Sequence, residues 1–371
     1  MSEEAPPAYR PAVLHATMLL AAGLMIAAYA LSVPPNEVTS ILPPEALSAA
    51  EWTSDVYMYE SLADTLRGGG EYYATLGDHL RRGNFPRVPV FNWRLPGWYS
   101  LMALLPSSGD ARLLAWAGLA LANALAWLGP NRSKRVALYA GITTAAFGVI
   151  AIHRHVIFMT EAPAAVLLFA SLVAYARGRD RLGAALGVSA LFVRELVAIY
   201  AVMAVAVALW RRRWGELLVW GAGFVAFAAF YAVHVHAVQG QLLPTDYLTE
   251  NRSWLQLGGL PFVVHCVEFH PIALTFTKGG DALLLALAFF GMWQRELAGG
   301  WHLRGAALAY GLFFLVAGFP FNSYWGVLWL APLSWLAVAG VEVLGTQIKT
   351  LVEAVRPPVQ PPPADQPPSQ G

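Results

Sequence analysis

LGAALGVSALFVRELVAIYAVMAVAVALW, residues 182–210, carries only two charged side chains, Arg194 and Glu195, and they lie near its centre. A single membrane-crossing helix would bury both charges in the middle of the bilayer, where ionised side chains are costly. It would also place the arginines of residues 177–181 and those of residues 211–213 on opposite sides of the membrane. Two short helices joined at Arg194 and Glu195 avoid both problems. We therefore predict a helical hairpin with this pair at its apex.

The whole chain has the composition of a membrane protein. Of its 371 residues, 57% are hydrophobic and only 13% are charged, and its mean hydropathy is +0.51. A water-soluble fold cannot hide that much apolar surface. The formal net charge of +1 gives no indication of a nucleic-acid partner. The single cysteine, Cys266, allows neither a disulfide framework nor a thiolate metal site. These features predict an all-α polytopic membrane protein.

Ten apolar stretches are candidate membrane-spanning helices, although several are shorter than the roughly 20 residues that a free-standing span needs. Shorter helices are tolerated when they pack inside a bundle. The candidates are residues 11–31, 110–128, 136–152, 162–176, 182–193, 196–210, 214–238, 282–293, 305–319 and 325–344. We therefore expect a bundle of about ten transmembrane helices.

Basic residues are distributed unequally between the short loops. If the hairpin forms, eleven basic residues lie on one side of the bundle and two on the other. The eleven are Arg132, Lys134, Arg135, Arg177, Arg179, Arg181, Arg211, Arg212, Arg213, Arg295 and Arg304. Cytoplasmic loops are enriched in Lys and Arg, so we expect this side and both termini to be cytoplasmic in a bacterial plasma membrane. The outer loops 32–109 and 239–281 would then form the site of a membrane domain, residues 1–353. Residues 354–371 are Pro-rich and are expected to form a disordered cytoplasmic tail.

The first outer loop contains EWTSDVYMYESLADTLRGGGEYY, residues 51–73. We expect two amphipathic helices here, 53–67 and 71–82, because three consecutive glycines disfavour helix continuation. Asp55 would present a carboxylate at the membrane surface. Such a carboxylate suits a general base that takes a proton from a hydroxyl group. The alternative role for Asp55 is that of a helix N-cap.

Further polar residues at the outer face are candidates for substrate contact. Tyr57 and Tyr59 lie close to the candidate base in the sequence. Arg94, in FNWRLPGW, is a candidate phosphate contact or, alternatively, an interface anchor beside aromatic residues. Arg194 and Glu195 are candidates because intramembrane charges are functional by default. The alternative for this pair is a structural ion-pair network within the bundle.

Three more residues complete the candidate set. Glu161, in FMTEAP, either contacts substrate or complements the dipole at the start of a helix. Lys278, in TFTKGGD, is a candidate contact for a lipid phosphate or, alternatively, a solvated lysine at the interface. Asn322, in FPFNSYW, could hydrogen-bond a sugar, as could Tyr324. The histidines have no metal-binding spacing, so we expect no metal ion and no cofactor.

Several of these motifs resemble a known family. The pattern D-x-Y-x-Y at residues 55–59, followed by LRGGGEYY at residues 66–73, is similar to the first extracytoplasmic loop of GT-C-type glycosyltransferases. The resemblance is greatest to bacterial polyprenol-phosphate-mannose-dependent mannosyltransferases and related envelope-glycopolymer proteins. TEAP at residues 160–163 and FVRE at residues 192–195 look like the same group. The chain lacks the paired acidic motif of many members.

The resemblance implies a membrane glycosyltransferase. Its donor would be a polyprenyl-phosphate sugar and its acceptor a lipid or glycan of the cell envelope, with membrane lipids around it. Asp55 would act as general base, Arg94 and Arg194 would contact the substrate phosphate, and the anomeric carbon would be inverted.

Two other functions stay open from the residues themselves. A transporter or flippase for an envelope lipid would use Arg194 and Glu195 along a translocation path, although the chain has no detectable internal repeat. A non-catalytic scaffold for glycopolymer assembly would need no catalytic carboxylate. Covalent product from a labelled donor would distinguish the enzyme from both.

Overall fold

The computed structural model describes residues 11–34, 55–107, 110–128, 134–152, 156–248, 256–275, 279–297 and 299–355. Every regular element in these ranges is a helix. Three helical segments are long and apolar enough to cross a membrane: Pro11–Ser32, Trp214–Gln239 and Pro320–Val355. Several shorter apolar helices accompany them. The described chain is therefore compatible with a helical membrane protein.

The helices occur where the hydropathy pattern predicts them. In chain order they are α1 (Pro11–Ser32), α2 (Asp55–Arg67), α3 (Tyr72–Arg82), η2 (Val90–Asn92), α4 (Pro96–Ala103), α5 (Ala111–Trp127), α6 (Lys134–Ile152), η4 (Val156–Phe158), α7 (Glu161–Ala176), α8 (Asp180–Val193), η5 (Glu195–Val197), α9 (Ala198–Trp210), α10 (Trp214–Gln239), η6 (Pro244–Leu248), α11 (Gly259–Val267), α12 (Pro271–Thr275), α13 (Gly280–Gly291), α14 (Gly300–Val316), η7 (Pro320–Trp329) and α15 (Leu330–Val355). A helix is present at each of the ten predicted positions and on either side of the glycine triplet. The short helices α11 and α12 were not predicted. The predicted tail, 354–371, lies almost wholly outside the described residues.

The predicted hairpin at Arg194 is present. Helix α8 ends at Val193, Arg194 is extended with φ −147° and ψ 118°, and α9 follows after the short helix η5. At the far end of the hairpin, Asp180 at the start of α8 forms an ion pair with Arg213, just beyond the end of α9. The two helices therefore run antiparallel. Arg194 and Glu195 lie in the connection between them and not in the middle of one long helix.

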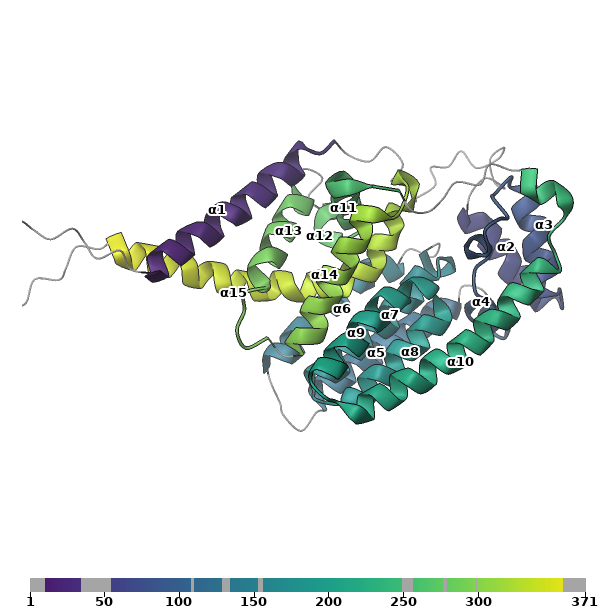
Figure 1. Ribbon diagram of the computed structural model, residues 1–371, viewed down its shortest axis with the longest axis horizontal. Coiled ribbons are helices and arrows are strands. Elements are labelled where there is room, and N and C mark those ends of the chain that lie inside the picture. Colours follow the sequence, from purple (N-terminus) through teal and green to yellow (C-terminus); the bar gives the residue numbers. More distant parts are fainter. Residues whose placement is uncertain are drawn as a thin grey trace, which may run out of the picture.

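The bundle has two chemically different ends. The loops that follow α7, α9 and α13 lie together, because Gly178, Arg211 and Arg295 line one small cavity. At the opposite end, α10 reaches the α2–α3 region along the outside of the bundle (Figure 1). The arginine-rich loops and the loop helices α2 and α3 are therefore separated by the length of the helices.

Helices α1, α13 and α15 pack against one another (Figure 1), and α15 also contacts α6, α7 and α14 of the main bundle. Glycines allow very close packing between α13 and α15. A Cβ atom built on Gly340 of α15 would overlap the carbonyl oxygen of Leu287 in α13, and one built on Gly291 would overlap the carbonyl oxygen of Leu336. Small residues at helix contacts let backbones approach in this way in membranes.

Gly340→Ala is therefore expected to destabilise the protein by about 1–3 kcal/mol, because the added methyl group forces α13 and α15 apart. The measurement is thermal unfolding of the detergent-solubilised protein. Gly345→Ala is the matched control on the same helix, since a Cβ there meets nothing within 4 Å. Equal losses in the two variants would contradict the close packing.

Candidate functional site

A cavity of about 830 Å³ lies at the end of the bundle that carries α2 and α3. Its walls come from α2, α3, the segment after α3 with η2, η5, α9, α10, α14 and η7. Most of the lining is apolar: Met58, Leu80, Phe85, Pro86, Pro89, Phe91, Leu196, Ala198, Ile199, Phe227, Phe313, Ala317, Phe321 and Trp325. The polar lining is Tyr59, Asn92, Arg94, Arg194, Glu195, Tyr231, Asn322 and Tyr324. An apolar cavity with a few charged side chains suits an amphiphile that has an apolar chain and a polar head.

Two of the arginines share a buried carboxylate. Nε of Arg194 lies 2.7 Å from Oε1 of Glu161, and Nη2 of Arg94 lies 3.8 Å from the same oxygen. The exposed fractions are 1% for Glu161, 2% for Arg194 and 6% for Arg94. Glu161 is also the first residue of α7, where the helix dipole favours a negative charge. Glu161 therefore occupies the helix-start position considered for it, and its charge partners are arginines of the protein itself; contact with substrate stays a prediction.

The arginines keep hydrogen-bonding capacity for a ligand. Arg94 donates to the hydroxyl oxygen of Tyr324 at 2.9 Å, and its guanidinium lies over the ring of Tyr59 at 5.6 Å. Arg194 also forms an ion pair with its neighbour Glu195. Among the described residues, Nη1 of Arg94 and Nη2 of Arg194 have no partner.

Glu195 adds an acceptor to the same wall of the cavity. Its Oε2 is buried and makes no hydrogen bond within the described part of the chain. The cluster of Arg94, Glu161, Arg194 and Glu195 balances two positive against two negative charges. It can therefore donate hydrogen bonds to an anionic oxygen and accept one from a hydroxyl, which is what a head group containing both a phosphate and a sugar requires.

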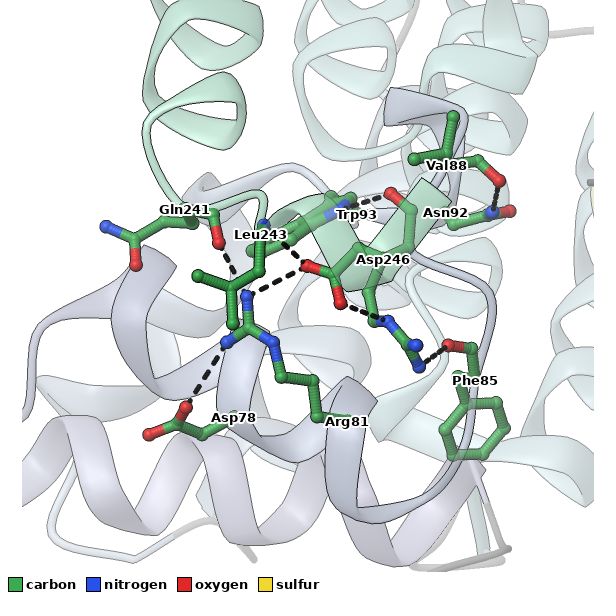
Figure 2. Close-up of polar contacts among 10 residues, drawn as sticks. Asp78, Arg81, Phe85, Val88, Asn92, Trp93, Gln241, Leu243 and Asp246 are labelled. Carbon is green, nitrogen blue, oxygen red and sulfur yellow. Dashed lines mark hydrogen bonds and ion pairs between the residues drawn. The ribbon is translucent and has the colours of Figure 1, made fainter. Parts of the chain in front are cut away.

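Asp246 holds the cavity wall in place (Figure 2). This residue of η6 is 1% exposed. Its carboxylate lies 3.0 Å from Nη2 of Arg81 in α3 and 2.9 Å from Nε of Arg87, and it accepts the backbone N–H of Leu243 at 2.9 Å. These contacts join α3 and the segment between α3 and α4 to the segment after α10. They fix the loop that contributes Phe85 and its neighbours to the cavity.

Asp246 is not among the residues predicted from the sequence. It is a single acidic residue in LPTDYL, with no motif around it, and its two arginine partners lie more than 150 positions earlier. The only signal was that residues 32–109 contain arginines and residues 239–281 contain carboxylates, and many pairings satisfy that description.

The Asp246 contacts predict a pH dependence. Burial alone would raise the pKa of Asp246, but hydrogen bonds from Arg81 and from the Leu243 N–H, with the charges of Arg81 and Arg87, hold its pKa below the ordinary value. Its stabilising contribution is therefore complete above the unfolded-state pKa of about 3.9 and is lost as the pH falls through the lower folded-state value.

Asp246→Asn is expected to lower the free energy of unfolding by about 1–3 kcal/mol near neutral pH. The difference from the wild type should shrink as the pH falls below about 4. Thermal unfolding across this pH range measures it. Asp78→Asn is the control, because the Asp78 side chain is 65% exposed and lies 3.4 Å from Arg81. A difference that grows on acidification would contradict the charge-pair explanation.

The structure brings together many of the predicted residues. Arg94, Arg194, Glu195, Tyr59 and Asn322 line one cavity, and their roles toward a substrate stay predictions. The side-chain oxygen of Asn322 accepts the backbone N–H of Phe319 at 2.9 Å, so it also holds the start of η7.

Tyr57, Asp55 and Lys278, three of the predicted residues, are not among the described residues that line the cavity. Tyr57 is half-buried and is not part of the cavity lining. Asp55 begins α2, and Met58 and Tyr59, three and four positions later, line the cavity. The side chain of Asp55 and all of Lys278 lie outside the described residues.

The histidines of the described ranges are dispersed rather than clustered. His234 contacts the hydroxyl of Tyr73 at 3.2 Å, and His270 contacts the hydroxyl of Ser334 at 2.7 Å. Within the ranges that the structure describes, no three His, Cys, Asp or Glu side chains are grouped in a way that could hold a metal ion. His153 and His155 fall outside those ranges.

Comparison with known proteins finds no match. No family model matches the chain, and neither a curated protein nor a solved structure is significantly similar to it.

Proposed function

We propose that the chain is a membrane glycosyltransferase that transfers a sugar from a polyprenyl-phosphate donor to a lipid or glycan acceptor of the cell envelope. The observation that carries this proposal is the cavity of about 830 Å³, whose apolar walls end at Arg94, Arg194 and Glu195. An isoprenoid chain suits the apolar walls. A phosphate and a sugar suit the adjoining hydrogen-bond donors and acceptor.

The proposed topology follows from the two ends of the bundle. The ten helices cross a bacterial plasma membrane, the arginine-rich loops face the cytoplasm, and the cavity opens at the outer face. Supporting this, Arg211, Arg213, Arg295 and Arg304 line one cavity at the end of the bundle opposite Arg94. Cytoplasmic loops carry such an excess of basic residues.

The proposed reaction is a single displacement with inversion. The acceptor oxygen bonds to the anomeric carbon while the bond from that carbon to the phosphate oxygen breaks. Asp55 takes the proton of the acceptor hydroxyl. Arg94 and Arg194 stabilise the charge that develops on the departing polyprenyl phosphate through their remaining N–H groups. Glu195 accepts a hydrogen bond from a sugar hydroxyl and so orients the ring.

The test uses the full-length protein in proteoliposomes that contain a polyprenyl phosphate carrying a labelled hexose and extracted envelope acceptors. The proposal predicts labelled acceptor and free polyprenyl phosphate, in equal amounts, only when the protein is present. Movement of intact donor across the bilayer without covalent product would instead identify a flippase. If the donor is neither consumed nor moved, the scaffold interpretation is favoured.

A further inference from the structure

A second cavity, of about 290 Å³, lies at the other end of the same helices. Helix α7 connects the two ends: Glu161 is beside the first cavity and Tyr175 lines the second. At 1.5 Å of rise per residue, they are about 20 Å apart. The second cavity is therefore a separate site that the proposed sugar transfer does not use.

Four arginines line this second cavity: Arg211, Arg213, Arg295 and Arg304. Among the described residues, two carboxylates, Asp180 and Glu216, line it with them. Arg213 is paired with Asp180, whereas Arg211 and Arg295 are exposed and have no partner among the described residues. The cavity therefore has an excess of positive charge that its own acidic groups do not neutralise.

Arg304 and the start of α14 add hydrogen-bond donors. Arg304 donates to the backbone carbonyl of Gln294, but its Nε is buried and has no partner in the described chain. Gly300 and Trp301, in the first turn of α14, line the cavity. The N–H groups of a first helical turn have no partner within the helix, and with the helix dipole they favour an anion.

Glu216 provides an acceptor at the same place. It is 2% exposed, and its Oε1 accepts from the Tyr175 hydroxyl at 2.8 Å and contacts Nε2 of His302 at 3.0 Å. Its Oε2 is buried and makes no hydrogen bond in the described part of the chain. A ligand that carries only an anion would leave this oxygen unsatisfied, whereas a hydroxyl on the ligand would bind it.

We propose that the second cavity binds a phosphate ester that also carries hydroxyl groups. The phosphate contacts the arginines and the first turn of α14, and a hydroxyl donates to Glu216. The volume lies at the small end for ligand pockets, so it suits a head group such as glycerol phosphate. Trp301, which lines the cavity and is 48% exposed, stacks edge-on with Trp210. Tryptophans of this kind mark membrane interfaces, which makes an anionic phospholipid a natural source of the ligand.

The experiment measures binding to the purified full-length protein in detergent. Native mass spectrometry compares phosphatidylglycerol with phosphatidylcholine, and thermal-shift titration compares glycerol 3-phosphate with methyl phosphate. The double variant Arg211→Gln/Arg295→Gln removes two exposed charges without disturbing a described contact. Arg212→Gln is the matched control, because Arg212 is exposed in the same turn but does not line the cavity.

The proposal predicts that phosphatidylglycerol, glycerol 3-phosphate or both bind. The double variant should bind at least about tenfold more weakly, since charged hydrogen bonds are lost, and Arg212→Gln should bind like the wild type. Binding of the phospholipid alone identifies a membrane source, and binding of the soluble ester identifies a cytosolic one. Where glycerol 3-phosphate binds, it should bind more tightly than methyl phosphate, which has no hydroxyl to donate to Glu216. If neither phosphatidylglycerol nor glycerol 3-phosphate binds, the proposal is wrong. Equal binding by the double variant and the wild type would overturn it as well.

Discussion

Glu161→Gln is expected to lower the free energy of unfolding by about 3–5 kcal/mol, the usual cost of removing one partner from a buried ion pair. The substitution preserves the shape of the side chain but removes the charge that faces Arg194 at 2.7 Å and Arg94 at 3.8 Å. All three side chains are almost completely buried. Among the described residues, the guanidinium of Arg194 would keep Glu195 as its one ionic partner.

A double-mutant cycle distinguishes this explanation from a general loss of packing. In Glu161→Gln/Arg194→Gln both charges of the contact between Glu161 and Arg194 are gone, so the double variant should lose less stability than the sum of the two single variants. Asp64→Asn serves as the control, because Asp64 pairs with Arg67 at a position where its side chain is 54% exposed. Thermal unfolding of the four proteins in detergent measures the coupling. An unchanged Glu161→Gln protein would contradict the ion-pair account.

Asp55→Asn is expected to reduce sugar transfer by a factor of about 10² to 10⁴, the usual contribution of a general base. The reason is chemical: an amide cannot take the acceptor proton. The structural support is the position of Asp55 at the start of α2, one turn before Met58 and Tyr59 of the cavity lining. The measurement is the initial rate of labelled product formation in proteoliposomes. Binding of the donor should stay close to the wild-type level.

Glu195→Gln is the informative comparison for that prediction. Among the described residues that line the cavity, Glu195 is the one that carries a carboxylate. We expect its loss mainly to weaken substrate binding, which would raise KM more than it lowers kcat. If Asp55→Asn transfers sugar at the wild-type rate while Glu195→Gln does not, the base has been assigned to the wrong carboxylate. Full activity of both variants would show that neither Asp55 nor Glu195 acts as the general base.

Much of the fold could be predicted from the sequence because membrane placement imposes strong constraints. The cost of burying Arg194 and Glu195 in one span predicted the break between α8 and α9, and the break is present. The glycines after Arg67 predicted the separation of α2 and α3 in the same way. In both cases a local feature of the chain was sufficient.

The polar contacts were predicted less well, because they depend on tertiary structure. Glu161 was predicted either to contact substrate or to lie at the start of a helix, and nothing near it in the sequence showed that two distant arginines would converge on its side chain. Asp246 was missed for the same reason. The second cavity was missed because its arginines had been interpreted only as markers of membrane orientation, and their arrangement around Glu216 needs three-dimensional information.

The most direct test of the central claim maps where a lipid-linked sugar binds. A polyprenyl-phosphate hexose with a photoreactive group on the isoprene unit next to the phosphate would be cross-linked to the full-length protein, and the adducts located by mass spectrometry. The account predicts adducts on cavity residues such as Leu196, Phe227 and Phe313, and their loss when unlabelled polyprenyl phosphate is added in excess. Adducts confined to exposed positions such as Leu24 and Val225, unaffected by the competitor, would contradict it.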